Sequence, residues 1–410
     1  MIKYFIYSLS ILLLLGNTYQ SNTQSTKNEL YLTTIASKDS LYSKTFEEQK
    51  QFWVQLPENY NSLKKYPVAY ILDGGVHLNT VKTIQNYYSG GYFPEMILIG
   101  ISNNTNRTRD LTTSQIKKFQ GSEMDENTGG AEKFTQFIKN ELIPYVDSKY
   151  ATTSYRTLIG HSYGGLFTIN TLINHPHLFE NYLAIDPSLD WDNQKLLNET
   201  KIKLQNENYS GKSLFISLNG QLHMQNSAIN IENVMQDTSN FTLFARSNIT
   251  FSNIVKQNAN NGLSFEWKFY PKDIHGTIAL PSIMDGLISI FEWYQMENTS
   301  KINSFETSKD ELFNIIKYRA KKLQTHFGYP VPPYPEELLN MSGYMNMDMQ
   351  QPEKAKMYFE QAIEYYPTSS NSYDSMADYY ESQNDKQNAI KYISKAYDLS
   401  GNEIYKQRLE

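Results

Sequence analysis

A serine flanked by glycines is the residue in this chain best suited to do chemistry. Ser162 lies in Gly160-His161-Ser162-Tyr163-Gly164, after an apolar run and before the amphipathic stretch 166–173. G-x-S-x-G between a strand and a helix predicts a nucleophile elbow, a sharp turn that presents the serine hydroxyl above a sheet edge. We expect glycine at 160 and 164 because a Cβ atom there would collide with the neighbouring strand or helix. The alternative is a structural turn that carries a non-catalytic serine.

A serine hydroxyl needs a base to become a nucleophile, and His275 is the histidine best placed to be that base. It lies in a loop after a predicted strand at 265–270 and before a predicted helix at 278–294. In the order serine, acid, histidine of an α/β-hydrolase, the base occurs at this point. Of the other histidines, His161 precedes the nucleophile, and we expect its side chain to point away from the hydroxyl. The rest lie in turns, at helix ends or beyond the sheet: His77, His175, His177, His223 and His326.

The acid that would orient this histidine is harder to place. We expect it after the predicted strand at 214–218, but the sequence there is Asn219-Gly220-Gln221, which has amides and no carboxylate. We predict Asp237 as the acid and Glu232 as the second choice. Asp186, at the end of the preceding predicted strand, is a third candidate. A solvated surface charge is the alternative for each, and a serine–histidine pair without an acid also stays open.

Backbone N–H groups must hold the negative oxygen that forms during acyl transfer. The N–H of Tyr163 follows the nucleophile, and Gly75 or Val76 would supply the second, in a glycine-containing turn after the predicted strand at 68–72. Asp73 would be a structural carboxylate of that turn. Trp191 lies beyond the carboxyl end of a predicted strand, where ligands bind in open α/β sheets, so it would line the substrate pocket or pack in the core.

Neither a metal nor a cofactor is predicted. The sequence has no phosphate-binding glycine-rich loop, zinc-ligand spacing or calcium loop. Arg107, Arg109 and Asp110 form a charged cluster, which we expect to organise a loop by ion pairing.

The elements that must position these residues alternate between short apolar strands and helices. Strands are predicted at 30–36, 51–56, 68–72, 96–101, 182–185, 214–218 and 265–270, with helical periodicity at 131–146. This alternation is typical of a mostly parallel sheet covered by helices on both faces. We therefore predict an α/β-hydrolase fold over residues 29–298.

The C-terminal part repeats itself with a period of 34 residues. Ala355 recurs as Ala389, Tyr358 as Tyr392 and Ala362 as Ala396. This period is typical of tetratricopeptide repeats, here at 336–410, after a helix and a proline-rich linker at 299–335. Two repeats are fewer than the three usually needed, so we expect them to pack on the helix that begins near Ser308 or on the catalytic domain.

The N-terminus and the composition bear on location and partners. Lys3 followed by the apolar run 4–15 predicts a signal peptide over 1–22 and export to the periplasm or outside the cell; an uncleaved anchor is the alternative. The chain has no cysteine, which excludes disulfides. Its net charge is −6, so nucleic acid is not an expected partner. Residues 334–410 hold 13 Asp and Glu against 7 Lys and Arg, so the acidity belongs to the C-terminal part.

Several motifs carry a family resemblance. They are Val54-Gln-Leu-Pro57-Glu-Asn-Tyr60, Tyr66-Pro67-Val68, Leu72-Asp73-Gly74, Asn106-Arg107-Thr-Arg109-Asp110-Leu111, Gly160 to Leu166, Asp186-Pro187-Ser188-Leu189 and His275-Gly276. Residues from about 39 to 294 resemble the bacterial esterases related to esterase D and to the enterobactin-type siderophore esterases. The tail resembles the tetratricopeptide segment of some exported members. The resemblance implies hydrolysis of carboxylic esters, with Ser162 as nucleophile and His275 as base. The sequence departs from the family after Leu218, where a clear acidic residue is missing, and the resemblance does not choose a substrate.

The sequence thus predicts an exported serine esterase that acts on a small-molecule ester through an acyl-enzyme. Two alternatives stay open: a catalytically inactive hydrolase-fold protein that binds a partner through its repeats, and an acyltransferase. The repeats would bind a protein or pack within the chain.

Overall fold

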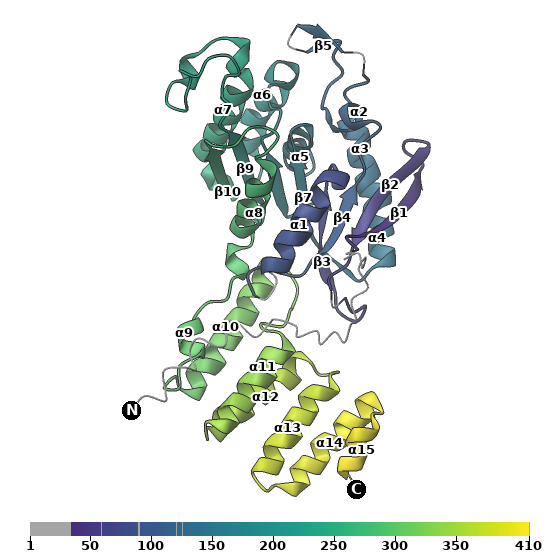
Figure 1. Cartoon of the computed structure of the whole chain (residues 1–410), viewed down its shortest axis with the longest axis vertical. Coiled ribbons are helices and arrows are strands. Elements are labelled where there is room, and N and C mark those ends of the chain that lie inside the picture. The colour runs from purple at the N-terminus through teal and green to yellow at the C-terminus, as the bar shows by residue number, and fades with distance from the viewer. Residues whose placement is uncertain (1–33, 59, 89–90, 120, 125, 410) are drawn as a thin grey trace, which may run out of the picture. The chain divides into compact units, whose positions relative to one another are not determined.

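The computed structural model describes residues 34–58, 60–88, 91–119, 121–124 and 126–409 (Figure 1). The chain divides into two units, Met1–Ile35 and Ala36–Glu410, and every strand and helix below lies in the second. The predicted signal peptide lies outside the described residues. The strand predicted at 30–36 is not seen in its described part, and the first strand, β1, begins at Ser37.

An eight-stranded sheet forms the centre of the larger domain, with the order β1-β2-β4-β3-β7-β8-β9-β10. Its strands are β1 (Ser37–Ser43), β2 (Glu48–Gln55), β3 (Tyr66–Ile71), β4 (Ile97–Ile101), β7 (Thr152–His161), β8 (Asn181–Ile185), β9 (Ser213–Asn219) and β10 (Ser264–Tyr270). The pairs β1–β2 and β2–β4 are antiparallel and all the other pairs are parallel. The predicted α/β class with a mostly parallel sheet is therefore confirmed.

Helices cover both faces of this sheet (Figure 1). They are α1 (Gly74–Tyr88), α2 (Arg107–Leu111), α3 (Ala131–Phe137), α4 (Ile143–Lys149), α5 (Tyr163–Asn174), α6 (Trp191–Asn206), α7 (Leu243–Gln257) and α8 (Ala279–Ile290). Side chains of a strand alternate between its two faces. Accordingly Val68 and Tyr70 of β3 join the core cluster that includes α5, whereas Ala69 and Ile71 join the one that includes α1 and α8. The central strands are buried on both faces, as expected of a parallel sheet.

Because the parallel strands run in one direction, their carboxyl ends meet at one edge of the sheet, where ligands bind in such folds. Asp73 follows β3 there, Ser162 follows β7 and Asp186 follows β8. Asn219 ends β9, and His275 lies in the loop between β10 and α8. Residues far apart in sequence can therefore meet at this edge.

The connection from β9 to α7 is an irregular segment with two short 3₁₀ turns, at Val234–Gln236 and Asn240–Thr242. It packs on a small core of its own, formed by Leu218, Leu222, Val234 and Ala245. This segment carries Glu232 and Asp237.

Helix pairs make up the C-terminal part. They are α11 (Glu336–Asp348) with α12 (Pro352–Tyr365) and α13 (Ser370–Ser382) with α14 (Lys386–Ser400), followed by α15 (Glu403–Leu409). Before them lie α9 (Thr299–Ile302) and α10 (Lys309–Phe327), and the Ser308 hydroxyl accepts a hydrogen bond from the Glu311 N–H at the start of α10. Leu312 and Ile316 of α10 share a core cluster with Leu339 and Tyr358 of the first pair. The repeats therefore pack on the helix that begins near Ser308, as expected.

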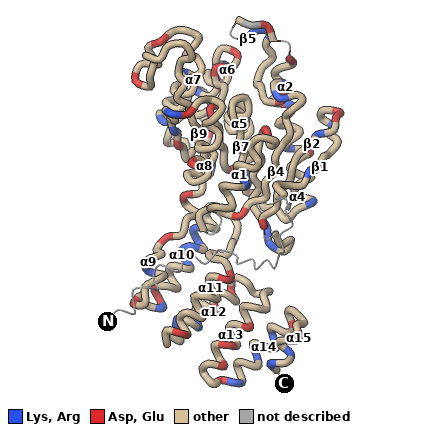
Figure 2. Tube along the Cα trace, in the orientation of Figure 1, with Lys and Arg blue, Asp and Glu red and all other residues tan. Residues whose placement is uncertain are grey.

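The acidic excess of the C-terminal part falls on these helices (Figure 2). Some of it is neutralised locally, since Arg408 of α15 pairs with Asp374, Asp378 and Glu381 of α13. Among the described residues, no helix is both long and apolar enough to cross a membrane.

Candidate active site

Ser162 occupies the sharp turn that its sequence predicts. It joins β7 to α5 with φ 61° and ψ −117°, and its N–H donates to the carbonyl of Ile185 at 3.0 Å. Few non-glycine residues adopt a positive φ, and such strain is concentrated at functional sites. The turn places the hydroxyl at the carboxyl edge of the sheet.

Close packing around this turn requires glycine at 160, as expected, and also at 165, but not at 164. A Cβ atom at Gly160 would lie 2.2 Å from the Gly164 oxygen, so this position must be glycine. A Cβ at Gly164 would lie 3.5 Å from Leu72, an ordinary contact, so the expectation of a collision there is wrong. The second crowded position is Gly165, where a Cβ would lie 2.8 Å from Pro187. The start of α5 therefore packs against the loop that follows β8.

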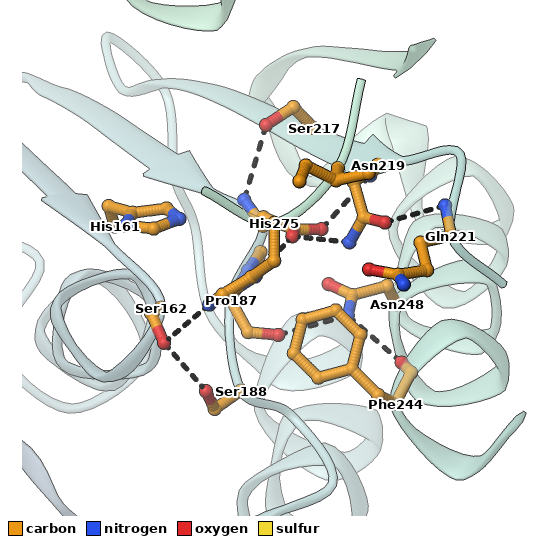
Figure 3. A network of polar contacts seen from close by, with 12 residues as sticks. His161, Ser162, Pro187, Ser188, Ser217, Asn219, Gln221, Phe244, Asn248 and His275 are labelled. Carbon is orange, nitrogen blue, oxygen red and sulfur yellow. Dashed lines mark hydrogen bonds and ion pairs between the residues drawn. The ribbon is translucent and has the colours of Figure 1, made fainter. Parts of the chain in front are cut away.

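Three side chains from three strand ends form a continuous polar chain (Figure 3). His275 Nε2 lies 3.0 Å from Ser162 Oγ, and His275 Nδ1 lies 2.5 Å from Asp186 Oδ2. The Asp186 side chain is 0% exposed, whereas that of His275 is 42% exposed. A serine, an imidazole and a buried carboxylate in this order make the arrangement by which serine hydrolases activate a hydroxyl.

The structure corrects the predicted acid, because neither Asp237 nor Glu232 contacts His275. Asp237 Oδ1 accepts hydrogen bonds from the Ser239 N–H at 2.6 Å and from the Thr242 hydroxyl at 3.1 Å. Hydrogen bonding from Ser239, and to a lesser degree from Thr242, holds the pKa of Asp237 below its usual value. Glu232 is exposed on the same segment. Both residues follow β9 in the chain, as the prediction requires, but this segment folds on its own core and uses Asp237 to cap a turn.

The predicted oxyanion donors lie at the starts of two helices. Tyr163 is the first residue of α5 and Gly75 is the second of α1. The first N–H groups of a helix have no acceptor within it, so neither N–H group is used by its own helix. The Val76 N–H instead donates to the Asp73 carbonyl at 2.8 Å. The Val76 N–H therefore already has an acceptor, and the Gly75 N–H remains the predicted second donor to the oxyanion.

Trp191 does not line an open pocket. Its side chain is 1% exposed, and its indole N–H donates to the Ser114 carbonyl at 3.3 Å. Its ring packs against Phe119 and Tyr163, with ring centres 5.1 and 5.3 Å apart. The sequence predicts that Trp191 either lines the substrate pocket or packs in the core, and the structure supports packing in the core against Tyr163.

The charged cluster of Arg107, Arg109 and Asp110 organises the surrounding loops by ion pairing, as predicted. Arg107 binds both carboxylate oxygens of Asp73 at 2.9 to 3.0 Å and the His161 carbonyl at 3.1 Å. Arg109 and Lys50 both pair with Asp110 and with Glu48. Asp73 is thus the structural carboxylate that the sequence predicts, and the network ties the loops after β3, β4 and β7 together.

The position of His161 beside two other histidines is not expected from the sequence. Its ring centre lies 4.6 Å from that of His275 and 5.6 Å from that of His77, so it lies beside the base. Burial, together with His275, His77 and Arg107, lowers the pKa of His161 to about 3. It is therefore neutral at neutral pH and presents no second charge to His275.

Three residues of this site are of types that can bind a metal ion. Ligand atoms of His161, Asp186 and His275 lie within 4.8 Å of one another. Asp186 already accepts hydrogen bonds from Asn219 and lies in contact with His275. The serine site accounts for this grouping without a metal ion.

Comparison with known proteins agrees with this geometry. Residues 43–241 match the family model described as "Putative esterase", and residues 336–369 and 370–403 match a tetratricopeptide repeat model. By this match, residues 43–241 are similar to this family of esterases. The family segment includes Ser162 and Asp186 and ends before His275.

Several relatives of this esterase domain carry names. The chain is 34% identical to ferri-bacillibactin esterase BesA of Bacillus subtilis, over 33% of this chain and 52% of that protein. It is 30% identical to a siderophore enterobactin esterase of Emericella nidulans, over 41% of this chain and 58% of that protein. The matches thus span little more than half the length of these curated relatives.

A solved structure matches more of the chain. An IroE-like serine hydrolase from Shewanella oneidensis is 26% identical with a TM-score of 0.65, over 80% of this chain and 99% of that one. Siderophore hydrolase EstA from Aspergillus nidulans has a TM-score of 0.55 at 20% identity, over 66% of this chain and 99% of that one, which shows a shared fold. The first of these matches covers a larger share of the chain than the esterase family model does.

Proposed function

We propose that this protein is a serine hydrolase of carboxylic esters. The observation that carries the proposal is the chain of contacts from Ser162 Oγ to His275 Nε2 and from His275 Nδ1 to buried Asp186. The esterase family match and the names of the relatives support ester hydrolysis as the reaction.

In this proposal His275 takes the proton of Ser162 as the oxygen attacks the ester carbonyl. Asp186 holds the imidazole in the required tautomer and stabilises the imidazolium that forms. The N–H groups of Tyr163 and Gly75 hold the negative oxygen. His275 then gives its proton to the leaving alcohol. Water, deprotonated by the same histidine, releases the acid from Ser162, so that ester and water become acid and alcohol.

Hydrolysis of p-nitrophenyl esters from acetate to octanoate tests this mechanism. We expect Ser162→Ala and His275→Ala to lower kcat by about 10⁴-fold or more, and Asp186→Asn by about 10³- to 10⁴-fold. Asp237→Asn is the matched control, an identical change at a carboxylate that does not contact His275, and it should keep wild-type activity. An active Ser162→Ala protein would rule out the acyl-enzyme.

A fluorophosphonate probe addresses the inactive-scaffold alternative without knowledge of the substrate. It should label wild type and not Ser162→Ala. The names of the relatives make siderophore esters the first natural substrates to test. An added alcohol or amine acceptor should give no transfer product, and a transfer product would favour the acyltransferase alternative.

We also propose that the protein is exported, on the basis of Lys3 and the apolar run 4–15. Fractionation of cells that express the full chain or the chain without residues 1–22 tests this. Only the full chain should reach the periplasm or the medium, and equal distribution of the two would contradict export.

A further inference from the structure

The end of β9 carries an amide at the place where the sequence analysis expects the acid. That residue is Asn219, the last of its strand. The carboxylate that meets His275 comes instead from Asp186, which directly follows β8. Strands β8 and β9 are parallel neighbours, so the two residues lie side by side at the edge of the sheet.

Asn219 donates two hydrogen bonds to this carboxylate (Figure 3). Its backbone N–H lies 3.0 Å from Asp186 Oδ1 and its side-chain Nδ2 lies 2.5 Å from Asp186 Oδ2. The orientation of the amide is fixed, because its Oδ1 accepts the Gln221 N–H at 2.7 Å. Asn219 is 4% exposed and Asp186 is 0% exposed. Hydrogen bonds to an ionised group are shorter and stronger than neutral ones, so these two hold the carboxylate in place.

The next residue ties the same strand end to the loop that carries the base. The Gly220 N–H donates to the Asp273 carbonyl at 2.8 Å. A Cβ atom at Gly220 would lie 2.3 Å from the Pro271 oxygen, so only glycine allows this close approach. Asn219 thus holds the acid while its neighbour holds the loop of His275.

We propose that Asn219 is a positioning residue for the catalytic acid, and that the acid and the amide can exchange places between these two strand ends. A carboxylate at position 219 with an amide at position 186 would then also serve His275. The inference rests on the proposed function, in which His275 activates Ser162. Its chemical basis is a count of donors and acceptors. Asp186→Asn alone brings two amides together and Asn219→Asp alone brings two carboxylates together, whereas the double exchange restores one of each.

The test measures kcat and KM on the best p-nitrophenyl ester for wild type, Asp186→Asn, Asn219→Asp and the double variant Asp186→Asn/Asn219→Asp. Each single substitution should lower kcat with little change in KM. The double variant should recover about tenfold or more of the kcat lost in Asp186→Asn, a coupling expected only of residues that act together. Asp237→Asn/Asn219→Asp is the control pair and should be no better than Asn219→Asp.

A folded double variant no more active than Asp186→Asn would overturn the exchange while leaving the esterase intact. If the double variant does not fold, Asn219→Ala decides the positioning role. A loss of kcat of about tenfold or more at unchanged KM supports it, and unchanged kcat overturns it. Wild type that hydrolyses no ester and resists the fluorophosphonate probe would instead remove the proposed function, and the positioning role with it.

Discussion

The strained backbone of Ser162 leads to the first prediction. Its φ of 61° and ψ of −117° suit glycine and disfavour any residue with a Cβ atom. We expect Ser162→Gly to be more stable to unfolding than Ser162→Ala by about 1 kcal/mol, since relief of about 1–3 kcal/mol of strain exceeds the unfolded-state entropy that glycine adds. Urea unfolding of the two inactive proteins measures this.

The control for that comparison is Ser148 in α4, where the backbone is helical. There glycine should be less stable than alanine by about 1 kcal/mol. Greater stability of alanine at both positions would show that the turn at Ser162 is not strained.

His161 leads to a prediction about pH. Its pKa falls from a usual 6.5 to about 3 on folding, because it is buried beside His275, His77 and Arg107. Below pH 6.5 the unfolded chain binds a proton that the folded protein excludes, so this residue lowers stability as pH falls from about 6.5 toward 3. Between pH 7 and pH 5, His161→Gln should lose about 2 kcal/mol less unfolding free energy than wild type.

Urea unfolding at the two pH values gives this difference directly. Equal losses for His161→Gln and wild type would mean that His161 is protonated in the folded protein.

At the scale of elements, the fit of α5 against the loop after β8 positions Asp186 relative to Ser162. A Cβ at Gly165 would press on Pro187 at 2.8 Å, whereas one at Gly164 meets Leu72 at an ordinary 3.5 Å. We expect Gly165→Ala to destabilise the protein by about 1–3 kcal/mol, as overpacking does, and to lower kcat by displacing Asp186. Gly164→Ala should change the unfolding free energy by less than about 1 kcal/mol. Thermal unfolding and ester turnover of both variants test this, and equal effects would contradict it.

The sequence predicts the strands and helices more completely than it predicts the contacts between their side chains. Alternating apolar strands and helices predicted the parallel sheet, and the local motif around Ser162 predicted its turn. The sequence does not single out Asp186, because its contact with His275 depends on which strand lies beside β9 and on the hydrogen bonds of Asn219. The position of His161 likewise depends on a loop more than a hundred residues away. Sequence spacing carries no direct record of such contacts between distant segments.

At the scale of the whole molecule, α10 links the end of the esterase domain to the repeats. Trp293 and His326 stack with ring centres 4.2 Å apart, and the Tyr329 hydroxyl donates to Thr153 at 2.9 Å. The N-terminal half of α10 contributes Leu312 and Ile316 to the core of the first repeat. Two repeats therefore gain from α10 the third packing surface that a short repeat array otherwise lacks.

Arg319 is central to this link and gives the last prediction. It is 5% exposed and donates to the carbonyls of Tyr294, Gln295 and Pro333, between the rings of Tyr294 and Tyr334. Arg319→Met keeps the bulk of the side chain but leaves three carbonyls without donors, which should cost about 3 kcal/mol or more. We expect calorimetry to show one unfolding transition for wild type and two for Arg319→Met, because the repeats and the esterase domain then unfold separately. Lys322→Met on the same helix removes an ion pair with exposed Glu297 and should cost less than about 1 kcal/mol. A single transition at unchanged temperature in Arg319→Met would show that the apolar contacts of α10 are enough to couple the two parts.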